Sequence, residues 1–205
     1  MNFSNTFNYL WIIAFMEKDI DLLYELGTMR FIKRAWCHFL TPEFANLAEH
    51  SFRVAWIAML IAKKERADTG KVAKIALVHD LSESRSCDAH YLAKLFVKRD
   101  EAGAISRSLE GTSLEDLKQL WLEFENRTSM EGRIVRDADT LDIDLELQEQ
   151  AVKGNKLKEI WKRDRRVTYE KLHTETAKKM WLLMQETNPH AWHTKENIFS
   201  EKYLK

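Results

Sequence analysis

Residues that interrupt helices are scarce in this sequence, which has 6 glycines and 2 prolines among 205 residues. Scarcity of both permits long uninterrupted helices, because glycine and proline are the two residues least favoured inside them. No run of alternating apolar and polar residues, the pattern of a half-buried strand, competes with the helical spacing of apolar residues. The sequence therefore predicts an all-α fold, a single-domain helical bundle with one core.

Cysteine is also scarce, and neither sign of charge dominates. Cys37 and Cys87 lie far apart and form no Cys-x-x-Cys unit, which is typical of free thiols in a reducing, cytoplasmic compartment. The 32 Lys and Arg residues are balanced by 32 Asp and Glu residues, so the formal net charge is zero. That balance argues against broad binding to nucleic acid and favours a small substrate or a protein partner.

Long apolar runs are missing as well. The most apolar stretch, Leu10–Met16, is far shorter than the ~20 residues that span a bilayer, and charged residues follow it directly. It predicts no membrane segment but a helix that packs on the domain or on a second subunit. We divide the chain into an N-terminal helical extension (1–18), a domain (19–187) and a C-terminal tail (188–205).

One apolar helix carries a histidine on its inner face. Val72, Ile75, Ala76 and His79 lie at i, i+3, i+4 and i+7, and Asp80 follows at once. A carboxylate beside an inward histidine is costly to bury unless a cation or a hydrogen-bond network compensates it. Alone, this pair is a common dipeptide and predicts no metal site.

A second histidine points inward from the preceding helix. Asn46 is the expected N-cap of that helix and Glu49 stands at the capping-box position. His50 shares one helix face with Val54 and Ile61. A core histidine bonded to a backbone carbonyl is the simpler interpretation of His50 by itself. Together with His79, it indicates a shared site.

The segment Arg133–Asp144 interleaves four aspartates with apolar residues. Such a helix is apolar on too many sides to leave every carboxylate in water, so at least one aspartate should be buried or half-buried. Asp139 is the candidate, because Val135 and Ile143 flank it at i−4 and i+4. The alternative is that the aspartates form a solvated face or one that is ion-paired with Arg133 and Arg136.

Other polar residues allow more than one interpretation. Glu83 follows His79 by four residues, which puts both on one side if the helix continues. Asp88 lies either in a pocket or at the N-cap of a helix from Tyr91 to about Ile105. Arg34 near Trp36 is typical of a surface pair, or else of a phosphate and sugar site.

Three further segments are a helix at Leu114–Phe124, a basic surface at Lys153–Arg166 that could also bind phosphate, and a last long helix at Tyr169–Gln185.

Two inward histidines and two aspartates form a mixed nitrogen and oxygen ligand set for one divalent ion. No thiolate belongs to the set, so it is unlike a closed structural zinc site and leaves positions for water and substrate. Such an ion polarises a phosphoryl oxygen, while a nearby glutamate orients or deprotonates water. Hydrolysis of a phosphate ester uses all these parts.

These residues, in this order, resemble the H…HD…D pattern of the HD-domain metal-dependent phosphohydrolases. The contexts around His50, His79-Asp80-x-x-Glu83 and Asp137-Ala-Asp139 are similar to the branch containing the 5′-deoxynucleotidases. The resemblance implies an HD-domain helical bundle, usually a homodimer. It also implies release of phosphate from deoxyribonucleoside 5′-monophosphates with one divalent ion, such as Co, Mn, Ni, Fe, Zn or Mg.

The resemblance also implies a role for each matching residue. Glu83 would serve the nucleophilic water, and Asp88 would help to protonate the leaving group or bind the sugar. Arg34 would hold the phosphate and Trp36 would crowd the sugar 2′ position, although this chain reads Lys-Arg-Ala-Trp where the family usually has Arg-Trp or Arg-x-Gly-Trp. The implied metal ligands are His50, His79, Asp80 and Asp139.

The sequence thus predicts a metal-dependent phosphohydrolase acting on (deoxy)ribonucleoside 5′-monophosphates. The chain lacks the Glu-Asp pair that follows the HD dipeptide in guanosine tetraphosphate hydrolases of this superfamily, which disfavours that activity. Two alternatives stay open. One is an HD hydrolase of another small phosphate ester or of a nucleotide with more phosphates. The other is a regulatory protein that binds metal or nucleotide without turnover.

Overall fold

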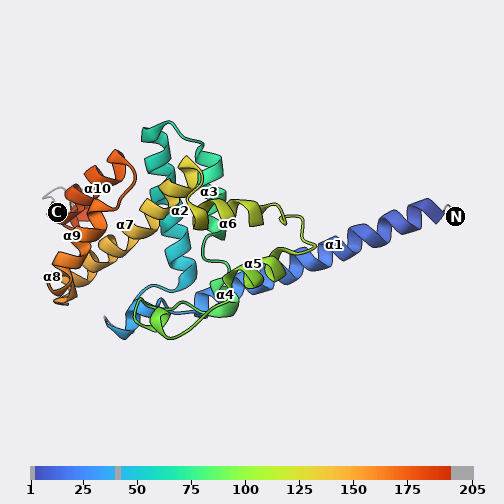
Figure 1. The fold of residues 1–205 in the computed structure, drawn as a ribbon, viewed down its shortest axis with the longest axis horizontal. Coiled ribbons are helices and arrows are strands. Elements are labelled where there is room, and N and C mark those ends of the chain that lie inside the picture. Colours follow the sequence, from blue (N-terminus) through green and yellow to red (C-terminus); the bar gives the residue numbers. More distant parts are fainter. Residues whose placement is uncertain (1–2, 40–42, 195–205) are drawn as a thin grey trace, which may run out of the picture.

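The structure is a computed structural model that describes residues 3–39 and 43–194, with the backbone alone for 3–15. The prediction of an all-α fold is confirmed, since the described residues contain no strand beyond one isolated bridge between Lys33 and Asn46. Figure 1 labels most of the helices, η denoting 3-10 helices. Their bounds are α1 Phe3–Thr28, η1 Met29–Phe31, η2 Ala35–His38, α2 Leu47–Glu65, α3 Thr69–Val78, α4 Glu83–Ser86, η3 Ala93–Leu95, α5 Glu101–Leu109, α6 Leu117–Asn126, α7 Met130–Val152, α8 Leu157–Ile160, α9 Lys162–Glu170, α10 Glu175–Glu186 and α11 Ala191–Thr194.

The main core lies where α2, α3 and α7 pack together, with α6 and α10 at its sides (Figure 1). Val54 and Ile61 of α2, Ile75 of α3 and Leu141 of α7 are fully buried there. Each such side chain contributes roughly 1.5–3 kcal/mol when it leaves water. The predicted inward faces of α2 and α3 are confirmed, and they bring His50 and His79 into the same interior.

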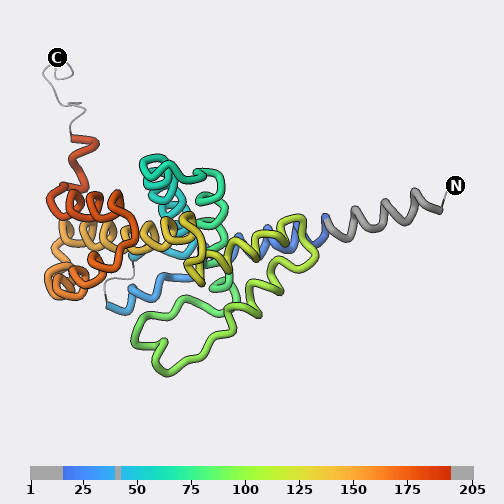
Figure 2. The backbone as a smooth tube through the Cα atoms, turned by 45° about the horizontal axis from the view of Figure 1, so that its top comes forward, coloured from blue at the N-terminus to red at the C-terminus, as the bar shows by residue number. Residues whose placement is uncertain are grey.

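A smaller core joins α1 to the rest of the bundle. Leu22 of α1 is buried with Val78 and Ile105. Glu25 accepts hydrogen bonds from Ser84, Arg85 and Ser108, so a carboxylate ties α1 to α4 and α5. Figure 2 shows the described part of α1 beside α5.

The predicted helix at Leu10–Met16 is confirmed, because α1 runs without a break through these residues and past residue 18. The packing predicted for this helix concerns side chains of residues 10–15, which lie outside the described ones. Residues 195–205 of the predicted tail also lie outside the described residues. None of the helices in the described part of the chain is long and apolar enough to cross a membrane.

The capping box predicted at Asn46 and Glu49 is confirmed. The Asn46 side chain accepts from the Glu49 backbone N–H, and the Glu49 carboxylate accepts from the Asn46 N–H, which completes the capping box. Asp68 caps α3 in the same manner by accepting from Lys71 N–H. These bonds set where α2 and α3 begin, and hence which residues reach the interior.

The alternative helix from Tyr91 to Ile105 is wrong. The chain there forms a loop with one short 3-10 helix, and α5 begins only at Glu101, capped by Asp100. The carboxylate of Asp88 is not a cap, because it accepts a hydrogen bond from Ala35 N–H, 53 residues away. Figure 2 shows this loop beside the segment that follows α1.

Two further helix predictions need correction. The helix expected at Leu114–Phe124 begins at Leu117 instead, and its Trp121 and Phe124 side chains are buried. The helix expected at Tyr169–Gln185 is two helices, α9 and α10. Buried Asp137 accepts hydrogen bonds from the backbone N–H groups of His173 and Thr174, which holds the chain in a turn between them.

Candidate functional site

The two histidines face each other in the interior. His50 of α2 and His79, directly after α3, are almost fully buried, and their Nε2 atoms lie 3.3 Å apart. His79 Nδ1 donates to the Ala76 carbonyl at 2.7 Å, and His50 Nδ1 lies 2.6 Å from the Asp142 carboxylate. Because both Nδ1 atoms are used as donors, each neutral ring directs an Nε2 lone pair toward the other.

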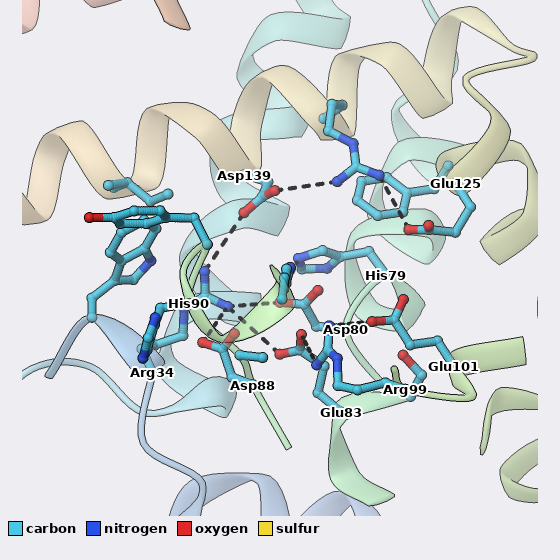
Figure 3. A pocket seen from close by; sticks show the side chains of 18 residues that line it. Arg34, His79, Asp80, Glu83, Asp88, His90, Arg99, Glu101, Glu125 and Asp139 are labelled. Carbon is cyan, nitrogen blue, oxygen red and sulfur yellow. Dashed lines mark hydrogen bonds and ion pairs between the residues drawn. The ribbon is translucent and has the colours of Figure 1, made fainter. Parts of the chain in front are cut away.

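The structure brings both predicted aspartates to the same point. Asp80 Oδ2 lies 3.3 Å from His79 Nε2 and 3.4 Å from His50 Nε2. One donor atom from each of these three residues lies within 4.8 Å of the other two. Asp139 reaches in from α7 (Figure 3) and is outside that triplet, but its Oδ1 is 3.3 Å from His50 Nε2.

These donors fit a divalent cation. Two imidazole nitrogens and two carboxylate oxygens form a set that such ions accept, and facing lone pairs repel unless a cation or a proton lies between them. Burial and the Arg34 charge lower the pKa of His50, but hydrogen bonds with Asp139, Asp142 and Asp80 raise it well above its ordinary value. The surroundings of Nε2 therefore attract positive charge.

The Arg34 side chain reaches both Asp139 and Asp80 (Figure 3). Its backbone N–H bonds to the Ala45 carbonyl beside the Lys33–Asn46 bridge, which ties this segment to the start of α2. The guanidinium is buried, with Nη1 3.0 Å from Asp80 and 3.5 Å from Asp88, and Nη2 3.9 Å from Asp139. A buried cation among several carboxylates neutralises them in part and leaves an excess of negative charge.

Glu83 reaches the site by a different route from the predicted one. The helix α3 ends at Val78, and Glu83 begins α4 after a short turn. Its Oε1 accepts from Arg99, whereas its buried Oε2 has no hydrogen-bond partner. Burial and the charges of Asp80 and Asp88 raise the pKa of Glu83 to about 9, against the effect of Arg34 and Arg99. A cation beside Asp80 would offset that negative charge.

A cavity of about 270 Å³ opens beside these residues. Seven of the eight residues predicted for the site line this cavity, namely Arg34, Trp36, His79, Asp80, Glu83, Asp88 and Asp139. The eighth, His50, does not line it, but its Nε2 lies 3.3 Å from that of His79. Every residue predicted for the site therefore lies in or directly behind one cavity.

Known proteins share this sequence pattern and fold. A sequence model of the HD domain matches residues 26–181. The chain belongs to the HD domain family. The predicted resemblance is thereby confirmed, and metal dependence, which goes with HD domains, agrees with the donor set described above.

Several relatives of this HD-domain protein carry the name 5′-deoxynucleotidase. HDDC2 of Dictyostelium discoideum is 26% identical over 148 residues, which cover 65% of this chain and 78% of that protein. Human HDDC2 is 27% identical over 137 residues, covering 63% and 67%. Yeast 5′-deoxynucleotidase YBR242W is 32% identical over 107 residues, covering 47% and 44%.

Two solved structures from Pyrococcus species have the same fold. A conserved hypothetical protein of Pyrococcus furiosus aligns with a TM-score of 0.67 and 29% identity, over 82% of this chain and 99% of that one. The PH0347 protein of Pyrococcus horikoshii aligns with a TM-score of 0.66 and 28% identity, over 82% and 96%. The likeness spans most of the described helices.

Sequence reasoning missed three residues of this HD domain. Asp142 accepts from His50, Arg99 pairs with Glu83, and Arg136 lies 3.8 Å above the ring of Phe124. Asp142 and Arg136 belong to the segment already singled out for its aspartates, so their spacing of three residues from Asp139 was an available signal. Arg99 follows a loop without periodicity, and nothing local marks it.

We expect the Asp142 carboxylate to strengthen metal binding by fixing the His50 ring. Asp142→Asn keeps the shape but removes the charge, and such substitutions beside metal-bound histidines weaken affinity roughly 10- to 100-fold. Titration calorimetry with Mn²⁺ or Co²⁺ measures the change. Asp144→Asn is the matched control, because this buried aspartate of the same helix pairs with Arg165 instead. Equal affinity in both variants would contradict the role of Asp142.

The pH dependence of stability should depend in part on Glu146 of α7. Its carboxylate accepts from Ala45 N–H, yet burial and the nearby Asp142 charge raise its pKa from 4.5 to about 7. Between these values the folded state binds more protons than the unfolded state, so this group lowers stability as the pH rises.

Glu146→Gln keeps the acceptor and removes the charge. Relative to the parent protein, the variant should gain roughly 1–3 kcal/mol of unfolding free energy at pH 8 and little at pH 4. Urea denaturation at both pH values measures the difference. Glu170→Gln, on the exposed surface of α9, serves as the control. A gain that is the same at both pH values would argue against this assignment.

Proposed function

We propose that this HD-domain protein is a metal-dependent phosphohydrolase that releases phosphate from (deoxy)ribonucleoside 5′-monophosphates. The observation that supports it best is the convergence of His50, His79, Asp80 and Asp139 at one point. Beside them lies the buried carboxylate of Glu83, whose Oε2 has no hydrogen-bond partner. The names of the relatives, 5′-deoxynucleotidase, supply the substrate class.

The four converging residues would hold one divalent ion. The set contains no thiolate, and its imidazole nitrogens and carboxylate oxygens can hold Co, Mn, Ni, Fe, Zn or Mg. When bound, the ion polarises a phosphoryl oxygen and makes a water molecule easier to deprotonate. The hydrogen bonds from the two Nδ1 atoms would keep both rings oriented for that task.

Arg34 would bind the substrate phosphate. Its guanidinium is buried at the cavity wall and already spans Asp80 and Asp139, so a phosphate beside these carboxylates lies within its reach. A planar guanidinium holds a phosphate through two parallel hydrogen bonds. It would orient the phosphorus and neutralise charge that develops on the phosphoryl oxygens.

Glu83 would take the proton of the attacking water. Arg99 holds one oxygen of its carboxylate, and the other, Oε2, has no hydrogen-bond partner and lies 4.0 Å from Arg34 Nη1 at the cavity wall. A buried acceptor without a partner is costly, and a water molecule at this position would remove that cost. A regulatory protein that only binds nucleotide has no use for this arrangement.

Asp88 and Trp36 would contact the sugar. Asp88 Oδ2 accepts from Ala35 N–H and lies 3.5 Å from Arg34, which leaves Oδ1 as the atom to accept from a sugar hydroxyl. Of the two roles that the resemblance allows, this geometry favours sugar binding over protonation of the leaving group. Trp36, two residues after Arg34 and also on the cavity wall, would crowd the 2′ position.

The central test is phosphate release from deoxy- and ribonucleoside monophosphates by the metal-loaded protein. Glu83→Gln should lower kcat roughly 10²- to 10⁴-fold, the usual contribution of a general base, with metal affinity unchanged. Glu101→Gln is a matched control, since this glutamate also lines the cavity and also pairs with Arg99. Absence of turnover on every nucleotide would remove the proposed function, and unchanged turnover in the variant would remove the role of Glu83.

We also propose that the protein acts as a cytoplasmic homodimer. Ile20, Leu23 and Tyr24 of α1 are exposed apolar side chains on a helix that the smaller core holds in place, and a second copy could cover them. Light scattering should give twice the chain mass, and Leu23→Asp should shift it toward the monomer. A monomeric parent protein at micromolar concentration would contradict the dimer.

A further inference from the structure

A second cavity of about 280 Å³ adjoins the first. Trp36 and Tyr91 line both cavities. The remaining wall comes from Trp161, at the turn between α8 and α9, and from Asp164, Arg165 and Thr168 of α9. The basic segment singled out in the sequence therefore contributes to the surroundings of the site.

Aromatic rings dominate this second cavity. Trp36 meets Trp161 edge to face, with ring centroids 5.1 Å apart and planes at 68°. Tyr91 lies 6.3 Å from Trp36 at 35°. Both tryptophans are only half-buried, and Tyr91 is 57% exposed. The rings thus offer uncovered aromatic faces to a ligand instead of filling a core.

Size supports a division of one ligand between the two cavities. Small-molecule sites usually measure about 300–1,000 Å³, and each cavity alone falls just short of that range. A mononucleotide has a charged phosphate at one end and a flat aromatic base at the other. The first cavity offers charged groups and the second offers rings, with Trp36 on the boundary where the sugar would lie.

We propose that the second cavity is the nucleobase subsite, in which the base of the substrate stacks on Trp161 while its phosphate lies beside Arg34. This inference rests on the proposed function, because it assumes that the ligand is a mononucleotide. It concerns the base, the part of the substrate that lies away from the reacting phosphate, and assigns its binding to α9 and the turn before it.

Two of the three polar residues that line the subsite are engaged already, and the third, Asp164, is exposed to solvent. Arg165 donates to the Asp144 carboxylate and to the Thr140 carbonyl, and Thr168 Oγ1 donates to the Asp164 carbonyl. Stacking tolerates every base, whereas hydrogen bonds select among them. The subsite should therefore bind purines and pyrimidines alike, with KM values within a few-fold of one another for a common sugar phosphate.

The test compares a substrate that has a base with one that lacks it. Removing an aromatic stacking partner weakens binding of a base roughly ten-fold or more. Trp161→Ala should raise KM for deoxyadenosine 5′-monophosphate by about that factor and leave KM for deoxyribose 5-phosphate unchanged. Trp161→Phe should restore the parent value. Trp56→Ala, which changes an exposed tryptophan on α2, is the matched control.

A rise in KM that is equal for both substrates, or absent for both, would overturn the subsite. Tyr91→Ala gives a second variant at an exposed side chain, should Trp161→Ala fail to fold, and the same selective loss is expected.

Binding without catalysis separates this inference from the proposed function. Deoxyadenosine, which has no phosphate, should perturb tryptophan indole N–H signals in an NMR titration of the parent protein, and this response should be lost in Trp161→Ala. If no nucleotide is hydrolysed but deoxyadenosine still binds in this manner, the proposed function fails and the subsite stands. If deoxyadenosine does not bind at millimolar concentration, the subsite is wrong whatever the activity.

Discussion

The structure depends on two hydrogen bonds that orient two buried imidazole rings. His50 donates to Asp142 and His79 donates to the Ala76 carbonyl, which leaves their Nε2 atoms facing each other at 3.3 Å. The first bond joins α2 to α7, whereas the second stays at the end of α3, the helix that His79 itself follows. The packing of α2 against α7 and the orientation of His50, a proposed metal ligand, therefore depend on the same contact.

Charge around these rings is balanced only in part. The buried Arg34 meets several carboxylates, yet negative charge remains in excess near Asp80, Glu83 and Asp88. An interior of this kind costs stability unless a cation occupies it. The same imbalance that makes the site costly to fold favours a metal ion beside the carboxylates.

The four aspartates of α7 have different structural roles. Asp137 holds the turn before α10, Asp142 orients His50, and Asp144 pairs with Arg165. Asp139 alone among them reaches the cavity. Spacing correctly indicated a half-buried aspartate at position 139, but it did not reveal that the other three are more deeply buried. Their partners lie on other helices, and no local pattern identifies them.

The sequence by itself determined the helical class, the capping box of Asn46 and Glu49, and the inward direction of His50 and His79. These features follow from hydrogen bonds and apolar spacing within a few residues, which a local pattern contains in full. The tertiary structure decided that Asp88 turns to Ala35 instead of capping a helix, that Arg99 holds Glu83, and that Trp161 adjoins Trp36. Each of these contacts joins separate elements, and its energy depends on burial and charge that exist only once the helices have packed.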